Sequence, residues 1–246
     1  MQLIKLNLPN NITLYVFQCR ESLSKYAAEY FLKIHKKSDY RFYIIPGGTT
    51  PAIFYDNLVN KIDDWSNTFL YLSDERIVNI SSDLCNEKFV HKALLDKIET
   101  KEKPYLFSIF KQNIGLKKIQ DFFELSVKEQ LKKGPPILTI LGAGLDGHTA
   151  SLFPGNPQIF LPSDKMTTVA KKNDESFYRL SMSFSALMKS SELLFLISGA
   201  EKSIMLRESL KDAYRPLKYP IQYLLKKFTR KKTILCDADA GKFLIE

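Results

Sequence analysis

The amino-acid sequence predicts an α/β fold in which a mostly parallel, doubly wound sheet carries helices on both faces. Short apolar runs alternate along the chain with segments whose apolar residues recur at helical spacing. Several runs are apolar at nearly every position, which is typical of strands buried on both faces of a parallel sheet. No repeat or long flexible linker interrupts the alternation, so residues 1–246 are expected to form a single domain.

Apolar runs predict strands over Ile12–Phe17, Phe42–Ile45, Phe69–Leu72, Ile137–Leu141, Leu193–Ile197 and Thr233–Cys236. Tyr178–Met182 alternates polar and apolar residues, which predicts a half-exposed strand, and Lys103–Phe107 predicts a short edge strand. Helical spacing predicts helices over Arg20–Lys36, Asn86–Leu95, Lys117–Leu131 and Phe184–Met188, and further helices that begin at Ala52 and near Ser198. The polar, proline-interrupted stretch Asn156–Asp174 predicts an irregular connection.

Composition and charge exclude several classes of protein. The formal net charge is +9, but the lysines are spread along the chain without a nucleic-acid-binding module, so nucleic acid is not an expected partner. No apolar run approaches the roughly 20 residues that span a bilayer, and the N-terminus lacks the pattern of a signal peptide. The three cysteines lie far apart, which indicates free thiols in a reducing compartment. We therefore expect a cytoplasmic protein with no membrane partner.

Other common chemistries have no matching pattern. The three histidines and three cysteines show no metal-ligand spacing, and the chain has neither a nucleophile elbow nor a Walker loop. Gly142, Gly144 and Gly147 fit the letters of a dinucleotide fingerprint, but the segment ends in Asp-Gly-His. We therefore expect no metal and no cofactor. His35, at the end of a predicted helix, is expected to be a helix-end cation, and His91 to be structural.

The stretch Ile137–Gly155 is the centre of the predicted site. A buried strand ends at Leu141, and three glycines follow it within a few residues, enclosing Asp146 and preceding His148. In open α/β sheets, ligands bind at the carboxyl ends of the strands, and glycines there allow a close approach of the backbone. An imidazole delivered to that edge beside a carboxylate is a candidate general base or acid.

A second loop has the pattern of a phosphate-binding site. Strand Phe42–Ile45 is followed at once by Pro46-Gly47-Gly48-Thr49-Thr50-Pro51 and then by a predicted helix. Exposed amide N–H groups at a helix start attract an anion, and the glycines let it come close. This loop is therefore expected to bind a phosphate group.

The motif Gly144–Gly155, which reads GLDGHTASLFPG, closely resembles the signature of the 6-phosphogluconolactonases, a family that shares its fold with the glucosamine-6-phosphate deaminases. The loop after Ile45 resembles that family's Ser-Gly-Gly-Ser-Thr-Pro loop, with Pro46 in place of the leading hydroxyl residue. The Asp-Glu-Arg triplet Asp74–Arg76 also matches the family, as do Arg179 and the Gly-x-x-Lys motif Gly199–Lys202.

The resemblance implies a Rossmann-like fold and the hydrolysis of 6-phosphoglucono-δ-lactone to 6-phosphogluconate, a step of the oxidative pentose phosphate pathway. A monomer is expected, with an oligomer as the open alternative. It implies two sets of site residues: a catalytic set of His148, Asp146, Asp74 and Arg76, and a substrate-binding set of Gly47, Gly48, Thr49, Thr50, Arg179 and Lys202. His148 is expected to activate water, and either Asp146 or Asp74 to support it. Arg76 or amides of the Gly142–Gly147 loop are expected to stabilise the oxyanion.

Two alternatives share this fold and its phosphate loop. The sister deaminases carry a glutamate five residues after the histidine, where this chain has Phe153, and this difference favours the lactonase. A non-catalytic sugar-phosphate sensor is the other alternative, but both the histidine and the Gly-Gly-Thr-Thr loop are intact.

Overall fold

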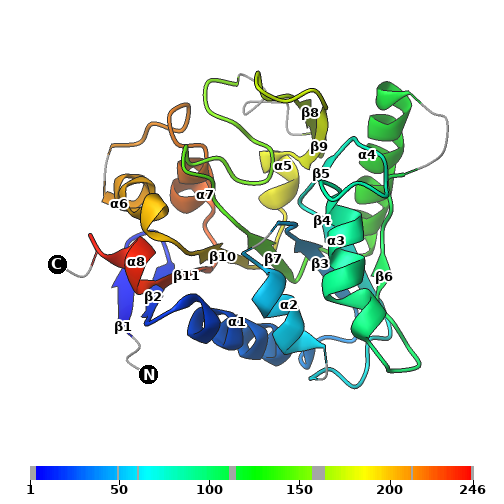
Figure 1. The fold of residues 1–246 in the computed structure, drawn as a ribbon, viewed down its shortest axis with the longest axis horizontal. Coiled ribbons are helices and arrows are strands. Elements are labelled where there is room, and N and C mark those ends of the chain that lie inside the picture. Colours follow the sequence, from blue (N-terminus) through cyan, green and yellow to red (C-terminus); the bar gives the residue numbers. More distant parts are fainter. Residues whose placement is uncertain are drawn as a thin grey trace.

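The computed structural model describes residues 4–48, 50–59, 61–110, 115–156, 164–211 and 213–244. Its larger sheet has eight strands in the order β1-β2-β11-β10-β7-β3-β4-β6 (Figure 1). These strands are β1 (Ile4–Leu8), β2 (Ile12–Phe17), β3 (Arg41–Ile45), β4 (Thr68–Leu72), β6 (Tyr105–Leu106), β7 (Leu138–Leu141), β10 (Leu193–Ile197) and β11 (Lys232–Asp237). Every neighbouring pair is parallel except the antiparallel β1–β2 hairpin. The predicted mostly parallel sheet is confirmed.

The order of the strands reverses between β3 and β7. From β3 the chain proceeds outward through β4 to β6, whereas from β7 it proceeds in the other direction through β10 to β11. Such a reversal opens a crevice at the carboxyl ends of the two central strands, because their connections run to opposite sides. The loops after Ile45 and Leu141, the two predicted ligand loops, both begin at this crevice.

Helices cover both faces of this sheet, as predicted (Figure 1). The helices are α1 (Arg20–His35), α2 (Ala52–Leu58), α3 (Asn86–Ala93), α4 (Leu116–Lys133), α5 (Phe184–Leu187), α6 (Ser203–Lys211), α7 (Ile221–Lys227) and α8 (Ala238–Gly241), with the short 3₁₀ segments η1 (Leu95–Lys97) and η3 (Ala200–Lys202). Buried residues of α1, α2 and α3 pack on one face, and those of α4 to α8 pack on the other.

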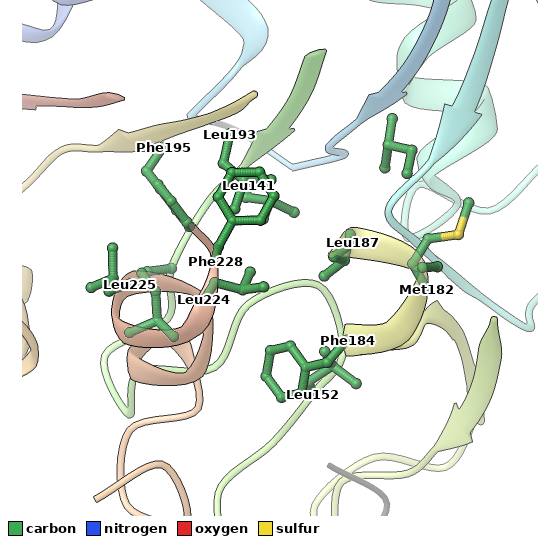
Figure 2. Packing of buried hydrophobic residues seen from close by; sticks show 14 of the residues in the cluster. Leu141, Leu152, Met182, Phe184, Leu187, Leu193, Phe195, Leu224, Leu225 and Phe228 are labelled. Atoms are coloured by element: carbon green, nitrogen blue, oxygen red, sulfur yellow. The ribbon is translucent and has the colours of Figure 1, made fainter. Parts of the chain in front are cut away.

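Successive residues of each central strand enter the two cores alternately. In β10, Leu193 and Phe195 join the core that faces α7, whereas Leu194 joins the core that faces α1. Figure 2 shows the first of these cores, in which Phe195 lies near Phe228 at the end of α7. Because a strand directs successive side chains to opposite faces, burial on both faces requires an apolar residue at almost every position. Burial on both faces therefore explains the uninterrupted apolar runs in the sequence.

A smaller antiparallel sheet lies beyond the ends of the central strands, in the order β5-β9-β8. Its strands are β5 (Asp74–Arg76), β8 (Thr167–Ala170) and β9 (Arg179–Met182). Only Ser73 separates β4 from β5, and it joins the two sheets because its N–H donates to Ile45 and its carbonyl accepts from Met182, each at 2.8 Å. The polar triplet Asp74–Arg76 is thereby fixed beside the crevice.

Several sequence predictions for this region are wrong. The stretch Asn156–Asp174 contains β8. The carboxylate of Glu124 on α4 holds the start of this strand, because it accepts the N–H groups of Thr167 and of Met166, the residue before the strand. Strand β9 is buried throughout and not half-exposed, since its polar residues Arg179 and Ser181 are buried as well as its apolar ones. The sequence reading also missed β1, β5 and α7.

The expectation that His35 is a helix-end cation is also wrong. Its side chain is buried among the rings of Phe31, Tyr43 and Trp65. Nε2 lies 2.9 Å from the carbonyl oxygen of Asp64, to which only a protonated nitrogen can donate, and Nδ1 lies 3.1 Å from the Tyr43 hydroxyl. Burial lowers the pKa of His35, although the bond to Asp64 opposes the shift. His35 is therefore a neutral core residue.

The buried imidazole predicts a pH dependence of folding stability. Because the folded pKa of His35 lies below its unfolded value, the unfolded chain takes up the proton first as the pH falls. The free energy of unfolding should therefore decline as the pH falls through about 6.5. Urea unfolding at about pH 8 and about pH 5.5 should show a smaller decline for His35→Gln than for the parent. His91→Gln, which changes an exposed histidine, should keep the parent's decline. Equal declines in all three proteins would contradict the assignment.

Candidate active site

A cavity opens in the crevice between β3 and β7, where segments from four strand ends meet. Its empty volume is about 680 Å³ when the part open to solvent is included, which accommodates a phosphorylated sugar. The described residues that line it are Pro46, Gly47, Gly48, Thr50, Pro51, Ser73, Asp74, Arg76, Asn86, Gly142, Ala143, Gly144, His148, Ala150, Arg179, Leu196 and Lys202. The site thus occupies the position expected for ligands in an open α/β sheet.

A tight turn after β7 directs His148 into the cavity. The N–H of Gly144 donates to the carbonyl of His148 at 2.9 Å, and the N–H of Gly147 donates to the carbonyl of Gly144 at 3.0 Å. The imidazole lies directly against the Cα of Gly144, where a Cβ would come within 2.1 Å of Cε1. Any side chain at position 144 would displace the ring. Glycine is required here by this contact.

The start of α7 supports the turn from outside. Gly147 has a φ of +74°, and a Cβ there would also lie 2.9 Å from the ring of Tyr219. The N–H of Ile221 donates to the carbonyl of Gly147 at 2.9 Å. The segment before α7 therefore packs on the turn that carries His148, and nothing in the sequence pattern pointed to this support.

Asp146 orients the imidazole. Its Oδ1 lies 2.5 Å from Nδ1 of His148. Burial alone would raise the pKa of Asp146, but the hydrogen bond and charge of His148 outweigh it, and the pKa falls to about 2. Asp146 is therefore ionised at neutral pH and accepts a hydrogen bond from Nδ1. In the neutral imidazole this leaves the lone pair on Nε2.

The second candidate carboxylate, Asp74, has other partners. Its Oδ2 accepts a hydrogen bond from the buried hydroxyl of Ser151 at 2.6 Å and lies 3.7 Å from Nη1 of Arg179. Asp74 lines the cavity, whereas Asp146 does not line it but bonds the imidazole that does. The two carboxylates left open by the sequence are thus distinguished: Asp146 contacts His148, and Asp74 contacts Ser151 and Arg179.

Glu75, which the sequence presented only as the middle of a triplet, fixes the position of its neighbours. Its buried carboxylate accepts the N–H groups of Arg76, Asn86 and Glu87 at 2.6 to 2.8 Å. Two of these donors belong to the first turn of α3, so Glu75 joins β5 to that helix. Burial raises the pKa of Glu75 to about 7, although these backbone hydrogen bonds oppose the shift. Asp74 and Arg76 are held in place by this connection.

Arg179 reaches the cavity from β9 and is tightly held. Its Nε and Nη2 donate to the carboxylate of Glu175 at 2.8 and 2.5 Å, in a two-pronged ion pair. The rings of Phe153 and Phe177 lie 5.7 and 5.5 Å from its guanidinium carbon. Burial would lower the pKa of Arg179, but Glu175 and Asp74 raise it. The sequence reasoning missed Glu175, for which the only signal was an acidic residue four positions before the arginine.

Lys202 lies in η3, after β10, and also lines the cavity. The preceding turn at Gly199 is fixed by Asp237, whose carboxylate accepts the Gly199 N–H at 3.1 Å and bonds the Ser198 hydroxyl. Burial lowers the pKa of Lys202, and the charge of Glu201 opposes this. With the described residues the ammonium makes no hydrogen bond or salt bridge, so it can receive an anion.

The predicted phosphate loop lies beside these cations. Gly47, Gly48 and Thr50 line the cavity, while Thr49 lies outside the described residues. A Cβ on Gly47 would lie 2.0 Å from Oδ1 of Asn86, so the loop packs directly on the start of α3. The carbonyl of Pro46 accepts a hydrogen bond from the buried Tyr55 hydroxyl at 2.6 Å. Pro46 is therefore anchored by its carbonyl, and the amide hydrogen that it lacks is not needed for this contact.

Comparison with known proteins places the chain among sugar-phosphate enzymes. The family model of glucosamine-6-phosphate isomerases/6-phosphogluconolactonase matches residues 18–235. A 6-phosphogluconolactonase of Helicobacter pylori is 33% identical over 208 residues, which cover 84% of this chain and 88% of that protein. One of Thermotoga maritima is 31% identical over 189 residues, which cover 75% of this chain and 81% of that protein.

Solved structures show the same fold. A Thermotoga maritima 6-phosphogluconolactonase superposes with a TM-score of 0.73 at 26% identity and covers 92% of this chain and 98% of its own. A monomeric glucosamine-6-phosphate deaminase superposes with a TM-score of 0.79 at 19% identity and covers 93% and 98%. The fold therefore does not separate the two activities. By its sequence and its fold, the chain belongs to the glucosamine-6-phosphate isomerase/6-phosphogluconolactonase family.

Proposed function

We propose that this chain hydrolyses 6-phosphoglucono-δ-lactone to 6-phosphogluconate, a step of the oxidative pentose phosphate pathway, with His148 as the general base. One observation carries the proposal: an imidazole oriented by Asp146 at 2.5 Å shares a cavity with Lys202, an ammonium that has no bonding partner in the described chain. The named relatives, which are 6-phosphogluconolactonases, support the choice of substrate.

The chemistry needs only proton transfer and stabilisation of charge. Nε2 of His148 accepts a proton from water while the water oxygen bonds to C1 of the lactone. The tetrahedral oxyanion then collapses, the bond between C1 and the ring oxygen breaks, and the imidazolium returns the proton to that oxygen. Ionised Asp146 stabilises the imidazolium through Nδ1. General base and acid assistance of this kind contributes roughly 10²–10⁴ in rate.

Arg76 is one candidate for the oxyanion, beside the amides of the Gly142–Gly147 loop that make no other bond. The amides of Gly144 and Gly147 donate within their own turn, so they are not available to a ligand. Arg76 lines the cavity, and among the described residues only one of its guanidinium nitrogens has a partner, since Nη1 donates to the carbonyl of Leu84 at 2.8 Å. A guanidinium beside C1 favours the negative oxygen of the transition state over the neutral carbonyl of the substrate.

The 6-phosphate is assigned to the loop Gly47, Gly48, Thr49 and Thr50, with Lys202 and Arg179. Of the two cations, Arg179 is already paired with Glu175 and lies near Asp74, so these carboxylates offset its charge. Lys202 has no such partner among the described residues, and it therefore contributes more of the net attraction for the dianion. The glycines and threonines supply hydrogen-bond donors around the phosphate oxygens.

The parent protein should hydrolyse the phosphorylated lactone and should release no ammonia from glucosamine 6-phosphate. A phenyl ring at position 153 cannot exchange protons with a leaving amine. Freshly prepared lactone in a pH-stat, with spontaneous opening subtracted, measures the first activity, and an ammonia assay measures the second. Ammonia release without lactone hydrolysis would overturn the proposal in favour of a deaminase. The absence of both activities would overturn it in favour of a binding protein.

His148→Asn should lower kcat by roughly 10²–10⁴-fold, because the base is removed while the phosphate site is kept. The affinity for 6-phosphogluconate, measured by calorimetry, should change little. His91→Asn is the matched control, because it removes an exposed imidazole of α3 and should leave turnover unchanged. Near-parental turnover of a folded His148→Asn protein would exclude His148 as the base.

Lys202→Met should raise KM for the phosphorylated lactone by about 10- to 100-fold, the scale of one charge-assisted hydrogen bond. Hydrolysis of unphosphorylated gluconolactone should hardly change, because that substrate has no group for Lys202 to bind. Lys33→Met, on the exposed side of α1, controls for the loss of one positive charge. Equal losses with both substrates would show that Lys202 acts near C1 or supports the fold.

A further inference from the structure

Phe153 contacts both functional ends of the cavity. Its side chain is buried, and its ring centroid lies 4.9 Å from that of His148 with the planes inclined at 57°. The same ring lies 5.7 Å from the guanidinium carbon of Arg179 and 5.3 Å from Nζ of Lys172. One aromatic side chain thus packs against the candidate base and against a candidate phosphate ligand.

Two other contacts position the imidazole. The bond from Asp146 fixes one atom, Nδ1, and the Cα of Gly144 supports the ring beside Cε1 and Nδ1. Both contacts come from within the same turn and lie on the same part of the ring. Phe153, five residues further along the chain, supplies an apolar contact from outside that turn. Catalytic side chains are held by packing as well as by hydrogen bonds, and the Phe153 ring supplies a packing contact of this kind.

Phe177 provides an internal comparison. Its ring lies 5.5 Å from the guanidinium carbon of Arg179, much as Phe153 does, but it has no ring contact with His148. Loss of either ring removes one apolar support of Arg179. Only loss of the Phe153 ring also removes a support of the imidazole.

We propose that Phe153 is a positioning residue that holds the imidazole of His148 with Nε2 facing the cavity. The catalytic consequence rests on the proposed function, in which Nε2 accepts the proton of water. A small misplacement of a catalytic group costs on the order of 10- to 100-fold in rate. Phe153→Leu should therefore lower kcat by about 10-fold or more, because leucine fills much of the space without the flat ring.

The kinetic test compares Phe153→Leu with Phe177→Leu. Both should raise KM for the phosphorylated lactone to a similar, modest extent, since each removes one contact of Arg179. Only Phe153→Leu should lower kcat. A kcat within a factor of about two of the parent in Phe153→Leu, or an equal fall in both variants, would overturn the proposal.

A second readout is independent of turnover. With imidazoles labelled by ¹⁵N and the sample at a pH where the ring is neutral, the parent should show His148 as a single tautomer, protonated on Nδ1 because Asp146 accepts a hydrogen bond from that atom. In Phe153→Leu the His148 ring should exchange between orientations, so its nitrogen shifts should be averages and not those of one tautomer. The spectrum of Phe177→Leu should match that of the parent. An unchanged His148 spectrum in Phe153→Leu would overturn the proposal.

If the parent proves to lack lactonase activity, the proposed function fails, but the nitrogen spectra still decide whether Phe153 positions the imidazole. If Phe153→Leu does not fold, as judged by circular dichroism, Phe153→Met replaces it, because methionine adapts to irregular space without presenting a ring. The expected spectra and kinetics of Phe153→Met are those given for leucine.

Discussion

The hydrogen bond between Nδ1 of His148 and the carboxylate of Asp146 is the interaction on which the site depends. Because an ionised carboxylate can only accept, the bond assigns the Nδ1 proton and leaves Nε2 as the basic atom. The bond forms only because the turn between the two residues is tight enough to bring them to 2.5 Å. The turn itself requires Gly144, which lies against the imidazole, and Gly147, which has a positive φ.

The fold delivers this turn to the right place by its strand order. Because the order reverses between β3 and β7, their two following loops face each other across one crevice. The smaller sheet then completes the site, since β5 and β9 bring Asp74 and Arg179 over its edge. The site holds both carboxylates and cations. The carboxylates of Asp74 and Glu175 lie against Arg179, whereas Lys202 has no partner in the described chain. In the proposed function, this ammonium receives the phosphate of the substrate.

The sequence predicted the parts of the fold that depend on local pattern. Strands such as β10 are apolar at every position, and His148 follows Asp146 within one motif, so both could be predicted from the sequence. The small sheet could not be predicted, because Asp74–Arg76 is polar and becomes a strand only by pairing with β9, far along the chain. The burial of His35 and the ion pair of Glu175 with Arg179 likewise depend on tertiary contacts. Local sequence alone does not encode them.

A crystal structure with the product 6-phosphogluconate bound would show directly how the site holds its ligand. We expect the phosphate beside Lys202 and the loop that begins at Gly47, and the C1 carboxylate within hydrogen-bonding distance of Nε2 of His148. At that distance, about 2.6–3.2 Å, the imidazole can exchange a proton with the attacking water. A reversed product, with its phosphate against His148 and its carboxylate against Lys202, would contradict the account.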